Sequence, residues 1–233
     1  MSSVNAVSSK SVSVGLACSL PFVELNKLYH AMENAFPGGG NKIVQFASAY
    51  GSEGADVIAF EIAQAAALAG KRVLFIDTTN VQHATAKELS AAVKLPLNTL
   101  FSSQTPVSEA IVFAERTTLF YATLNSNGND AFALNDIAKF QELLHSLRDT
   151  YELVVIASVT IVANNVGLYL AKAVDGVILV IEAQNSRAPV VMEAKKMLEE
   201  SGSNIIGAVL NKRRLYIPQY LYRWLYHNGR RQK

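Results

Sequence analysis

The sequence predicts an α/β fold, with a doubly wound, mostly parallel sheet and helices on both of its faces. Apolar runs of strand length, such as residues 72 to 77 and 153 to 157, alternate with amphipathic stretches of helical length. This alternation is typical of parallel sheets, because each crossover between parallel strands needs a helix. The chain has 233 residues, 50% of them hydrophobic, which suffices for one well-buried domain of this kind.

The N-terminal part is expected to lead from a flexible segment into the first strand. Residues 1 to 20 are rich in Ser and Val and lack helical periodicity, so we expect a flexible segment there. Residues 24 to 36 carry apolar side chains at helical spacing and predict a helix, which the following Pro and Gly residues end. Residues 43 to 48 predict the first strand, and residues 56 to 69 predict a helix ended by Gly70.

The rest of the globular part follows the same alternation. Further helices share an apolar stripe and are expected over residues 84 to 93, 106 to 114, 134 to 148, 164 to 172 and from Pro189 up to Gly202. Further strands share short apolar runs and are expected over residues 72 to 77, 118 to 124, 153 to 157, 176 to 181 and 204 to 210. The domain is therefore expected to span residues 21 to 214, followed by a basic, aromatic tail over residues 215 to 233.

Residues 41 to 57 predict a buried strand, a glycine loop and the start of a helix, which is the architecture of a phosphate-binding P-loop. A working loop has the pattern GxxxxGK[ST], in which the Lys reaches the phosphates and the hydroxyl holds Mg²⁺. Here Gly51 and Gly54 provide the bend, but Ala55 replaces the Lys and Asp56 the hydroxyl. Losing the Lys removes roughly 3 kcal/mol of attraction for a polyphosphate, and Asp56 adds repulsion. Tight Mg-ATP binding is therefore not expected.

Three acidic residues near this loop have simpler interpretations beside a functional one. Asp56 is favoured as an N-terminal helix cap, and Glu53 as a loop residue on the surface. Asp77, at the end of its strand, is either a metal or water ligand, a solvated acid or the cap of a neighbouring helix.

Composition and charge exclude several classes of protein. Cys18 is the single cysteine, so an internal disulfide framework is excluded, and the four His residues lack metal-ligand spacing. No apolar run is long enough to span a membrane, and the single cysteine agrees with a reducing cytoplasm. The first 200 residues carry all 19 acids and only 14 of the 21 cations, so the body is acidic and nucleic acid is not an expected partner.

The tail carries seven cations after Glu200 and a pattern of apolar residues at helical spacing. It predicts a basic amphipathic helix, which either docks on its own domain or lies on an anionic membrane surface or on a membrane partner. The candidate contact residues are Arg213, Arg214, Tyr220, Arg223 and Trp224.

Five stretches together resemble the cytoplasmic domain of the bacterial tyrosine kinases that work with polysaccharide co-polymerases. This family is related to the division-site and chromosome-partitioning ATPases. The stretches are residues 51 to 54, 69 to 77, 151 to 156, 174 to 180 and 206 to 211, and the resemblance covers residues 22 to 217. It implies a P-loop NTPase-like fold.

The departures from the family fall where catalysis would take place. The resemblance puts the phosphate-binding Lys at Ala55, the Mg-binding hydroxyl at Asp56 and the Walker B acid at Ala157. Asp77 matches the first acid of the remaining acidic motif, but Thr79 replaces the second. No catalytic residue and no metal site are therefore expected. A degenerate nucleotide site, at most weak for ATP or ADP, would comprise Gly51, Ser52, Glu53, Gly54, Ala55, Asp56 and Asp77.

The family's early helix carries a Glu-x-x-Arg-x-x-Arg pattern that joins subunits in a ring. This chain has Glu24, Lys27 and His30 at those positions, which are the candidates for a homo-oligomer interface. Lys lacks the bidentate fork of Arg, and His is mostly neutral at pH 7, so the ring itself is not expected.

The resemblance and its departures together imply a catalytically silent pseudokinase that regulates or scaffolds exopolysaccharide or capsule synthesis and export. Its partners would be a membrane polysaccharide co-polymerase or other polysaccharide-synthesis proteins, at the inner face of the cell membrane. Two alternatives remain open. One is a residual ATP/ADP-binding switch or tyrosine kinase of polysaccharide synthesis, and the other is a membrane- or partner-localising protein of the division-site ATPase type.

Overall fold

The computed structural model describes residues 10–12, 21–36, 39–51, 53–101, 105–124, 134–163 and 165–212. The strands are β1 (Lys10–Val12), β2 (Lys42–Ser48), β3 (Val73–Asp77), β4 (Ile111–Ala114), β5 (Leu119–Thr123), β6 (Leu153–Ala157), β7 (Gly176–Glu182) and β8 (Ile205–Asn211). The α-helices are α1 (Phe22–Asn34), α2 (Ala55–Leu68), α3 (Ala84–Ala92), α4 (Leu134–Thr150), α5 (Asn165–Ala173) and α6 (Ala188–Glu200). Two 3₁₀ turns are η1 (Leu97–Phe101) and η2 (Val107–Glu109).

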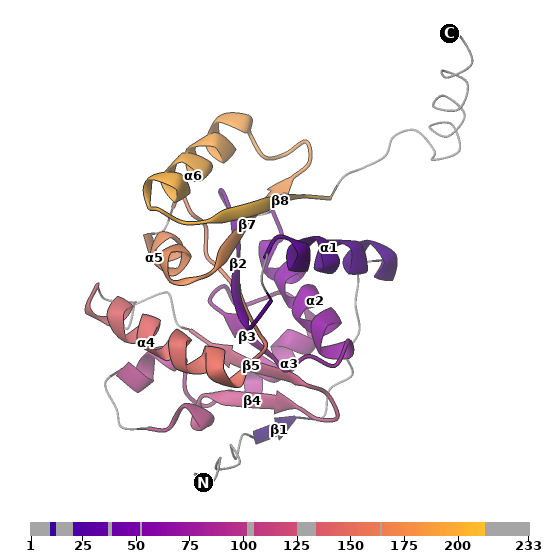
Figure 1. Ribbon diagram of the computed structural model, residues 1–233, viewed down its shortest axis with the longest axis vertical. Helices are drawn as coiled ribbons and strands as arrows, with labels where there is room; N and C mark the ends of the chain where they lie inside the picture. Colours follow the sequence, from indigo (N-terminus) through magenta and orange to yellow (C-terminus); the bar gives the residue numbers. More distant parts are fainter. Residues whose placement is uncertain are drawn as a thin grey trace.

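The strands of the described residues form one sheet in the order β1-β4-β5-β3-β6-β2-β7-β8 (Figure 1). Neighbouring strands are parallel except β4 and β5, which are antiparallel. Among the described elements, α2, α4 and α6 each connect strands that run parallel in this sheet. The predicted mostly parallel, doubly wound sheet is confirmed.

Helices cover both faces of this sheet. One core cluster joins α1, α2 and α3 to the side chains that β2, β3, β5 and β6 direct to the same face, including Phe46, Phe75 and Tyr121. Two further clusters join α4, α5 and α6 to the opposite face. Phe60 of α2 packs against Phe75 at 5.0 Å between ring centroids, and Phe75 stacks on Tyr121 at 5.6 Å. Such aromatic pairs add about 1 kcal/mol each beyond the burial of their surface.

Two sequence predictions are wrong in part. Residues 106 to 114 were expected to form a helix, but they form η2 and then β4, whose Ile111 pairs with Ala122 of β5. A strand suits the mostly buried apolar run Ile111–Ala114 because it pairs with β1 and β5 in the sheet and α3 packs against it. Lys10–Val12 lie in the segment expected to be flexible, yet they form β1 and pair with β4. The other helices and strands predicted up to residue 210 are confirmed, with bounds shifted by one or two residues, and the predicted tail helix falls outside the described residues.

The register of the central strands brings three chain segments together at the carboxyl edge of the sheet. Phe46 of β2 and Asp77 of β3 both lie opposite Ala157 of β6. Parallel α/β folds bind ligands at this edge. Among the described residues, no helix is both long and apolar enough to cross a membrane.

Candidate functional site

The predicted P-loop lies between β2 and α2. Gly51 and Gly54 have φ angles of 134° and 77°, in the region that favours glycine, and Gly54 is the N-cap of α2. The loop therefore keeps the sharp bend that brings the start of α2 to the carboxyl edge of the sheet.

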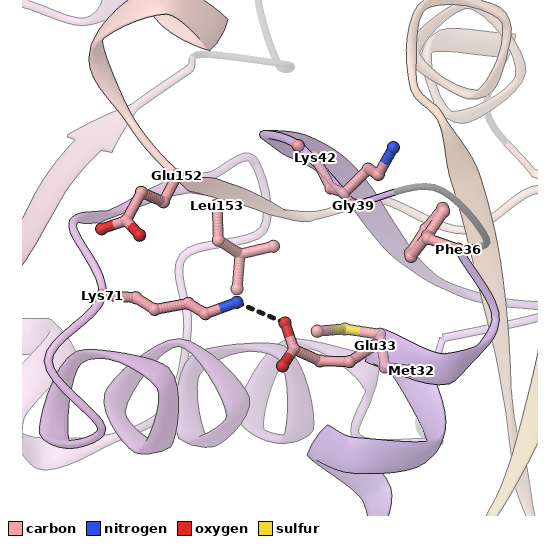
Figure 2. A pocket seen from close by; sticks show the side chains of 9 residues that line it. Met32, Glu33, Phe36, Gly39, Lys42, Lys71, Glu152 and Leu153 are labelled. Atoms are coloured by element: carbon pink, nitrogen blue, oxygen red, sulfur yellow. Dashed lines mark hydrogen bonds and ion pairs between the residues drawn. The ribbon is translucent and has the colours of Figure 1, made fainter.

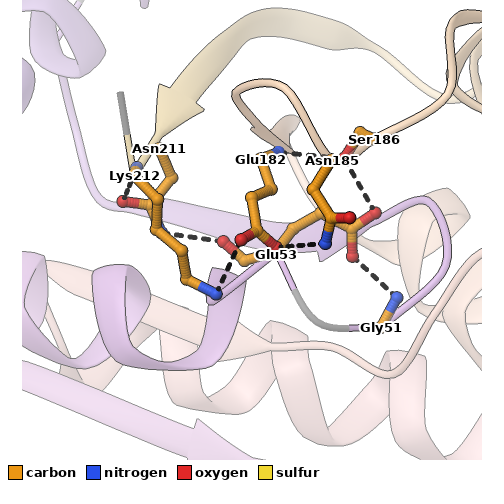
Figure 3. Close-up of polar contacts among 7 residues, drawn as sticks. All are labelled: Gly51, Glu53, Glu182, Asn185, Ser186, Asn211 and Lys212. Carbon is orange, nitrogen blue, oxygen red and sulfur yellow. Dashed lines mark hydrogen bonds and ion pairs between the residues drawn. The ribbon is translucent and has the colours of Figure 1, made fainter. Parts of the chain in front are cut away.

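Glu53 is not the surface residue that was expected, because only 3% of it is exposed. Its carboxylate accepts hydrogen bonds from the backbone N–H of Gly51 at 2.7 Å and of Tyr50 at 3.2 Å. The hydroxyl of Ser186, in the loop after β7, donates to it at 3.3 Å (Figure 3). Glu53 thus closes the P-loop on itself and ties it to the neighbouring loop.

The end of β8 supports the same loop from the side. The Asn211 amide donates to the Glu53 carbonyl at 2.7 Å, and Lys212 forms an ion pair with Glu182 at 3.3 Å (Figure 3). A Cβ added at Gly54 would lie 2.8 Å from Nδ2 of Asn211. The loop is therefore packed against β8 so closely that only glycine fits at position 54.

Asp56 lies in the first turn of α2 and is not the N-terminal cap that was expected, since that position belongs to Gly54. Its carboxylate lies 3.5 Å from the backbone nitrogen of Gln82. Within the described part of the chain, the N–H groups of Ala55, Asp56 and Val57 donate to no acceptor. This helix start thus presents both free donors and one negative charge.

A cavity of about 470 Å³ opens where β2, β3 and β6 end beside the start of α2. Its lining is rich in hydroxyl and amide groups and holds one carboxylate, that of Asp56. The described residues that line it are Ser48, Gly51, Ala55, Asp56, Thr78, Thr79, Asn80, Gln82, Ser158, Val159, Thr160 and Ala163. No Lys, Arg or His is among them. We call this space the loop cavity.

Asp77 belongs to the structure beside the loop cavity rather than to its lining. It is 3% exposed, and its carboxylate accepts backbone N–H groups from Thr79 and Asn80 at 2.8 Å and from Val81 at 2.9 Å. The Tyr121 hydroxyl donates to it at 2.6 Å. Burial, together with the Asp77 charge, raises the pKa of Tyr121. The oxygens of Asp77 are therefore engaged in shaping the turn after β3.

The remaining predicted site residues lie away from the loop cavity or outside the described residues. Glu24, Lys27 and His30 are exposed on one side of α1, whose opposite side buries Leu25 and Tyr29. The predictions for Ser52, Arg213, Arg214, Tyr220, Arg223 and Trp224 fall outside the described residues. No cluster of three or more potential metal-ligating side chains occurs in the described ranges.

A second cavity, of about 290 Å³, lies at the opposite edge of the sheet and carries the cations that the loop cavity lacks. Lys42 and Lys71 line it, with Glu33 and Glu152 (Figure 2). Lys71 forms an ion pair with Glu33. Burial alone would lower the pKa of Lys71, but hydrogen bonds with Glu33 and Tyr29 outweigh it and raise that pKa. This cavity is thus internally neutralised.

Several residues of the loop cavity were not predicted from the sequence, namely Ser48, Thr78, Ser158 and Thr160. Each lies at the end of a strand or within three residues after one. Polar residues at the carboxyl ends of successive parallel strands are the signal that could have identified them.

The sequence is similar to bacterial tyrosine kinases. It is 26% identical to tyrosine-protein kinase CpsD of Streptococcus agalactiae over 179 residues, which cover 76% of this chain and 77% of the relative. It is also 26% identical to the putative tyrosine-protein kinase CapB of Staphylococcus aureus over 161 residues, covering 69% and 71% of the two chains. No protein-family model matches the sequence.

Solved structures that include a bacterial tyrosine kinase domain and a cell division protein share the fold. The kinase domain of the Escherichia coli tyrosine kinase ETK has a TM-score of 0.71 at 18% identity, covering 89% of this chain and 92% of that one. The chimerical protein CapA2B2 has a TM-score of 0.72 at 19% identity, covering 88% and 94%. The cell division protein MinD of Aquifex aeolicus has a TM-score of 0.63 at 16% identity, covering 81% and 73%. The predicted resemblance to the bacterial tyrosine kinases is confirmed, and the chain shares the fold of their kinase domains and of MinD.

Proposed function

We propose that this protein is a catalytically silent relative of the bacterial tyrosine kinases, which regulates or scaffolds exopolysaccharide or capsule synthesis and export in the cytoplasm. The observation that carries the proposal is a P-loop whose Gly51 and Gly54 keep positive φ angles, beside a cavity whose described lining holds a carboxylate and no cation. A kinase needs a cationic side chain at this place to hold the polyphosphate, together with ligands for Mg²⁺.

The electrostatics oppose a nucleotide polyphosphate. The start of α2 attracts an anion by no more than about 1 to 2 kcal/mol. Asp56 lies in that same first turn, and its charge opposes a phosphate by roughly 3 kcal/mol at about 5 Å. Ala55 is buried and apolar, so it offers no compensating attraction. The residues present therefore do not fit Mg-ATP.

The acids beside the loop do not restore a metal site. The carboxylate oxygens of Asp77 already accept hydrogen bonds from three backbone N–H groups and from the Tyr121 hydroxyl. The strand position opposite it on β6 is Ala157, which has no oxygen ligand in its side chain. Hard cations such as Mg²⁺ need several oxygen ligands in near-octahedral geometry. With Asp56 as the one carboxylate of the described lining, Mg²⁺ would depend on substrate phosphates for further ligands, and no cation in that lining holds them.

What remains is an α/β domain whose exposed faces can bind partners. The exposed side of α1, with Glu24, Lys27 and His30, is the candidate surface for a second copy. By analogy with the tyrosine kinases that it resembles, the partner we propose is a membrane polysaccharide co-polymerase. The protein would act by occupying a place in that assembly rather than by transferring phosphate.

Calorimetric titration with Mg-ATP and Mg-ADP tests whether the protein has lost nucleotide binding. We expect no binding heat for the natural protein and measurable binding for an Ala55→Lys, Asp56→Ser double variant, because the loop keeps its shape. A matched control, Ala163→Lys, introduces the same cation into this lining from the segment between β6 and α5 instead of from the start of α2. Micromolar binding by the natural protein, or tyrosine autophosphorylation detected by mass spectrometry, would overturn the proposal.

A further inference from the structure

The loop cavity has lost the charges that suit a nucleotide, but it has kept its size. Its volume of about 470 Å³ lies within the usual range of small-molecule sites. Strand ends and a helix start surround it, which are the rigid elements of the fold. What this cavity binds in place of a nucleotide rests on the proposed function, in which the domain no longer transfers phosphate.

Ser48 indicates that a polar ligand is expected in this cavity. It lines the cavity, it is only 5% exposed, and its hydroxyl makes no hydrogen bond with any described residue. The Ser48 oxygen is open to the cavity rather than sealed off in the core, so a ligand in the cavity can form a hydrogen bond with it. Ser48 ends β2 directly below the loop, so it faces the same space as the start of α2.

The charges on the cavity wall select against ions. The free N–H groups of Ala55 and Asp56 disfavour a cation, while the Asp56 carboxylate disfavours an anion. An uncharged ligand avoids both penalties and loses less hydration on entry. To pair with all of these groups, the ligand must donate a hydrogen bond to the Asp56 carboxylate and also accept hydrogen bonds from the N–H groups.

A hydroxyl group does both, since it donates one hydrogen bond and accepts two. The other polar side chains of the lining are hydroxyls and amides, including Thr79, Asn80 and Thr160, which also pair with hydroxyl groups. We propose that the loop cavity binds an uncharged sugar ring, with the Asp56 carboxylate accepting from its hydroxyls and the start of α2 and Ser48 donating to them.

This assignment deepens the proposed function, because it gives the silent domain a signal to respond to. A sugar bound here would touch the P-loop, which Asn211 and Glu53 tie to the end of β8. The described lining carries no aromatic side chain on which a sugar ring could stack, so we expect millimolar rather than micromolar affinity.

Nuclear magnetic resonance titration of the full chain with methyl glucoside, methyl galactoside and N-acetylglucosamine tests the proposal. We expect amide shifts that saturate at millimolar sugar and cluster at residues around Ser48, Asp56 and Thr160. Asp56→Ala should weaken binding about tenfold or more, because hydrogen bonds to a charged group are the strongest that the cavity offers. Ser48→Ala should weaken it several-fold. Asp149→Asn, which changes an exposed acid at the end of α4, should leave the affinity unchanged.

The outcomes separate this inference from the proposed function. If none of the sugars binds and Mg-ATP does not bind either, only the sugar assignment fails. If adenosine binds and the sugars do not, the cavity belongs to a nucleoside and the sugar assignment is overturned. If Mg-ATP binds more tightly than every sugar, both proposals fail. Sugar binding that Asp56→Ala leaves unchanged would place the ligand elsewhere and also overturn the assignment.

Discussion

Asp77 is an acid that resembles a catalytic residue in sequence but acts as a structural one in the fold. The carboxylate is buried, and each of its oxygens accepts hydrogen bonds from the turn that follows β3. Tyr121 completes this set from β5, the neighbouring strand. Removing the Tyr121 hydroxyl leaves a buried charge with one donor fewer, which costs more than losing an exposed hydrogen bond.

Tyr121→Phe should therefore lower the free energy of unfolding by about 1.5 to 3 kcal/mol while keeping the ring packing. Urea denaturation of both proteins measures the difference. Tyr50→Phe is the matched control, since Tyr50 is 73% exposed, and it should change stability by less than about 0.5 kcal/mol. Equal stability of Tyr121→Phe and the natural protein would show that Asp77 does not depend on this donor.

Ionisation of the Tyr151 hydroxyl makes the free energy of unfolding depend on pH in the alkaline range. Burial raises its pKa to about 12, against an opposing effect of Arg72, so the unfolded chain loses this proton first. The contribution is complete below about pH 10 and is lost as the pH rises to about 12, by roughly 3 kcal/mol at most. Tyr151→Phe cannot ionise and should lose less stability across this interval. Urea denaturation at several pH values compares the two slopes, and parallel slopes would contradict the prediction.

The P-loop and β8 act as one unit at the scale of elements. Gly54 has a φ of 77° and faces Asn211, whereas Gly207 in the middle of β8 has open space around it. Gly54→Ala should cost about 1 to 3 kcal/mol, because it combines backbone strain with a close contact. Gly207→Ala should be neutral or stabilising by up to about 1 kcal/mol.

Chemical denaturation measures both variants, and hydrogen exchange shows where the effect lies. Gly54→Ala should increase exchange in the P-loop and at the end of β8 together, since Asn211 holds both. Increased exchange confined to the loop would mean that the two elements are not coupled.

The elements differ in how well the sequence predicts them. Buried strands such as β3 and β6 are continuous apolar runs between clear turn signals, so their positions follow from local pattern. Residues 106 to 114 were mistaken for a helix because the apolar run Ile111–Ala114 has no period of its own. Its identity as β4 depends on pairing with β5, a contact that no local pattern shows.

The residues of the candidate site also differ in how well the sequence predicts their roles. The glycines and the substitutions at Ala55 and Asp56 could be read directly from the sequence. The burial of Glu53 could not, because it depends on Ser186 and Asn211, more than 130 residues away in the chain. The hydroxyls of the loop cavity come from three strand ends, which only the folded sheet brings together.

At the scale of the whole molecule, charge is divided between the folded body and the C-terminal tail. The chain after Lys212 holds six of the 21 cations and none of the 19 acids, so a protein ending at Lys212 has a formal net charge of −4. The described domain ends at Lys212, beyond β8, and no described strand or helix is lost by this truncation. The tail can therefore be tested separately from the fold.

Full-length protein should co-sediment with phosphatidylglycerol vesicles at low salt, and protein ending at Lys212 should not. Each basic residue near an anionic membrane contributes about 1 kcal/mol, so six of them suffice for measurable binding, whereas the remaining acidic body is repelled. Vesicles of uncharged lipid and added salt are the controls, and both should abolish sedimentation. Equal sedimentation of the two proteins would assign membrane binding to the folded domain. A tail that binds neither vesicle type would instead favour docking on its own domain, where its cations would offset the charge of the acidic body.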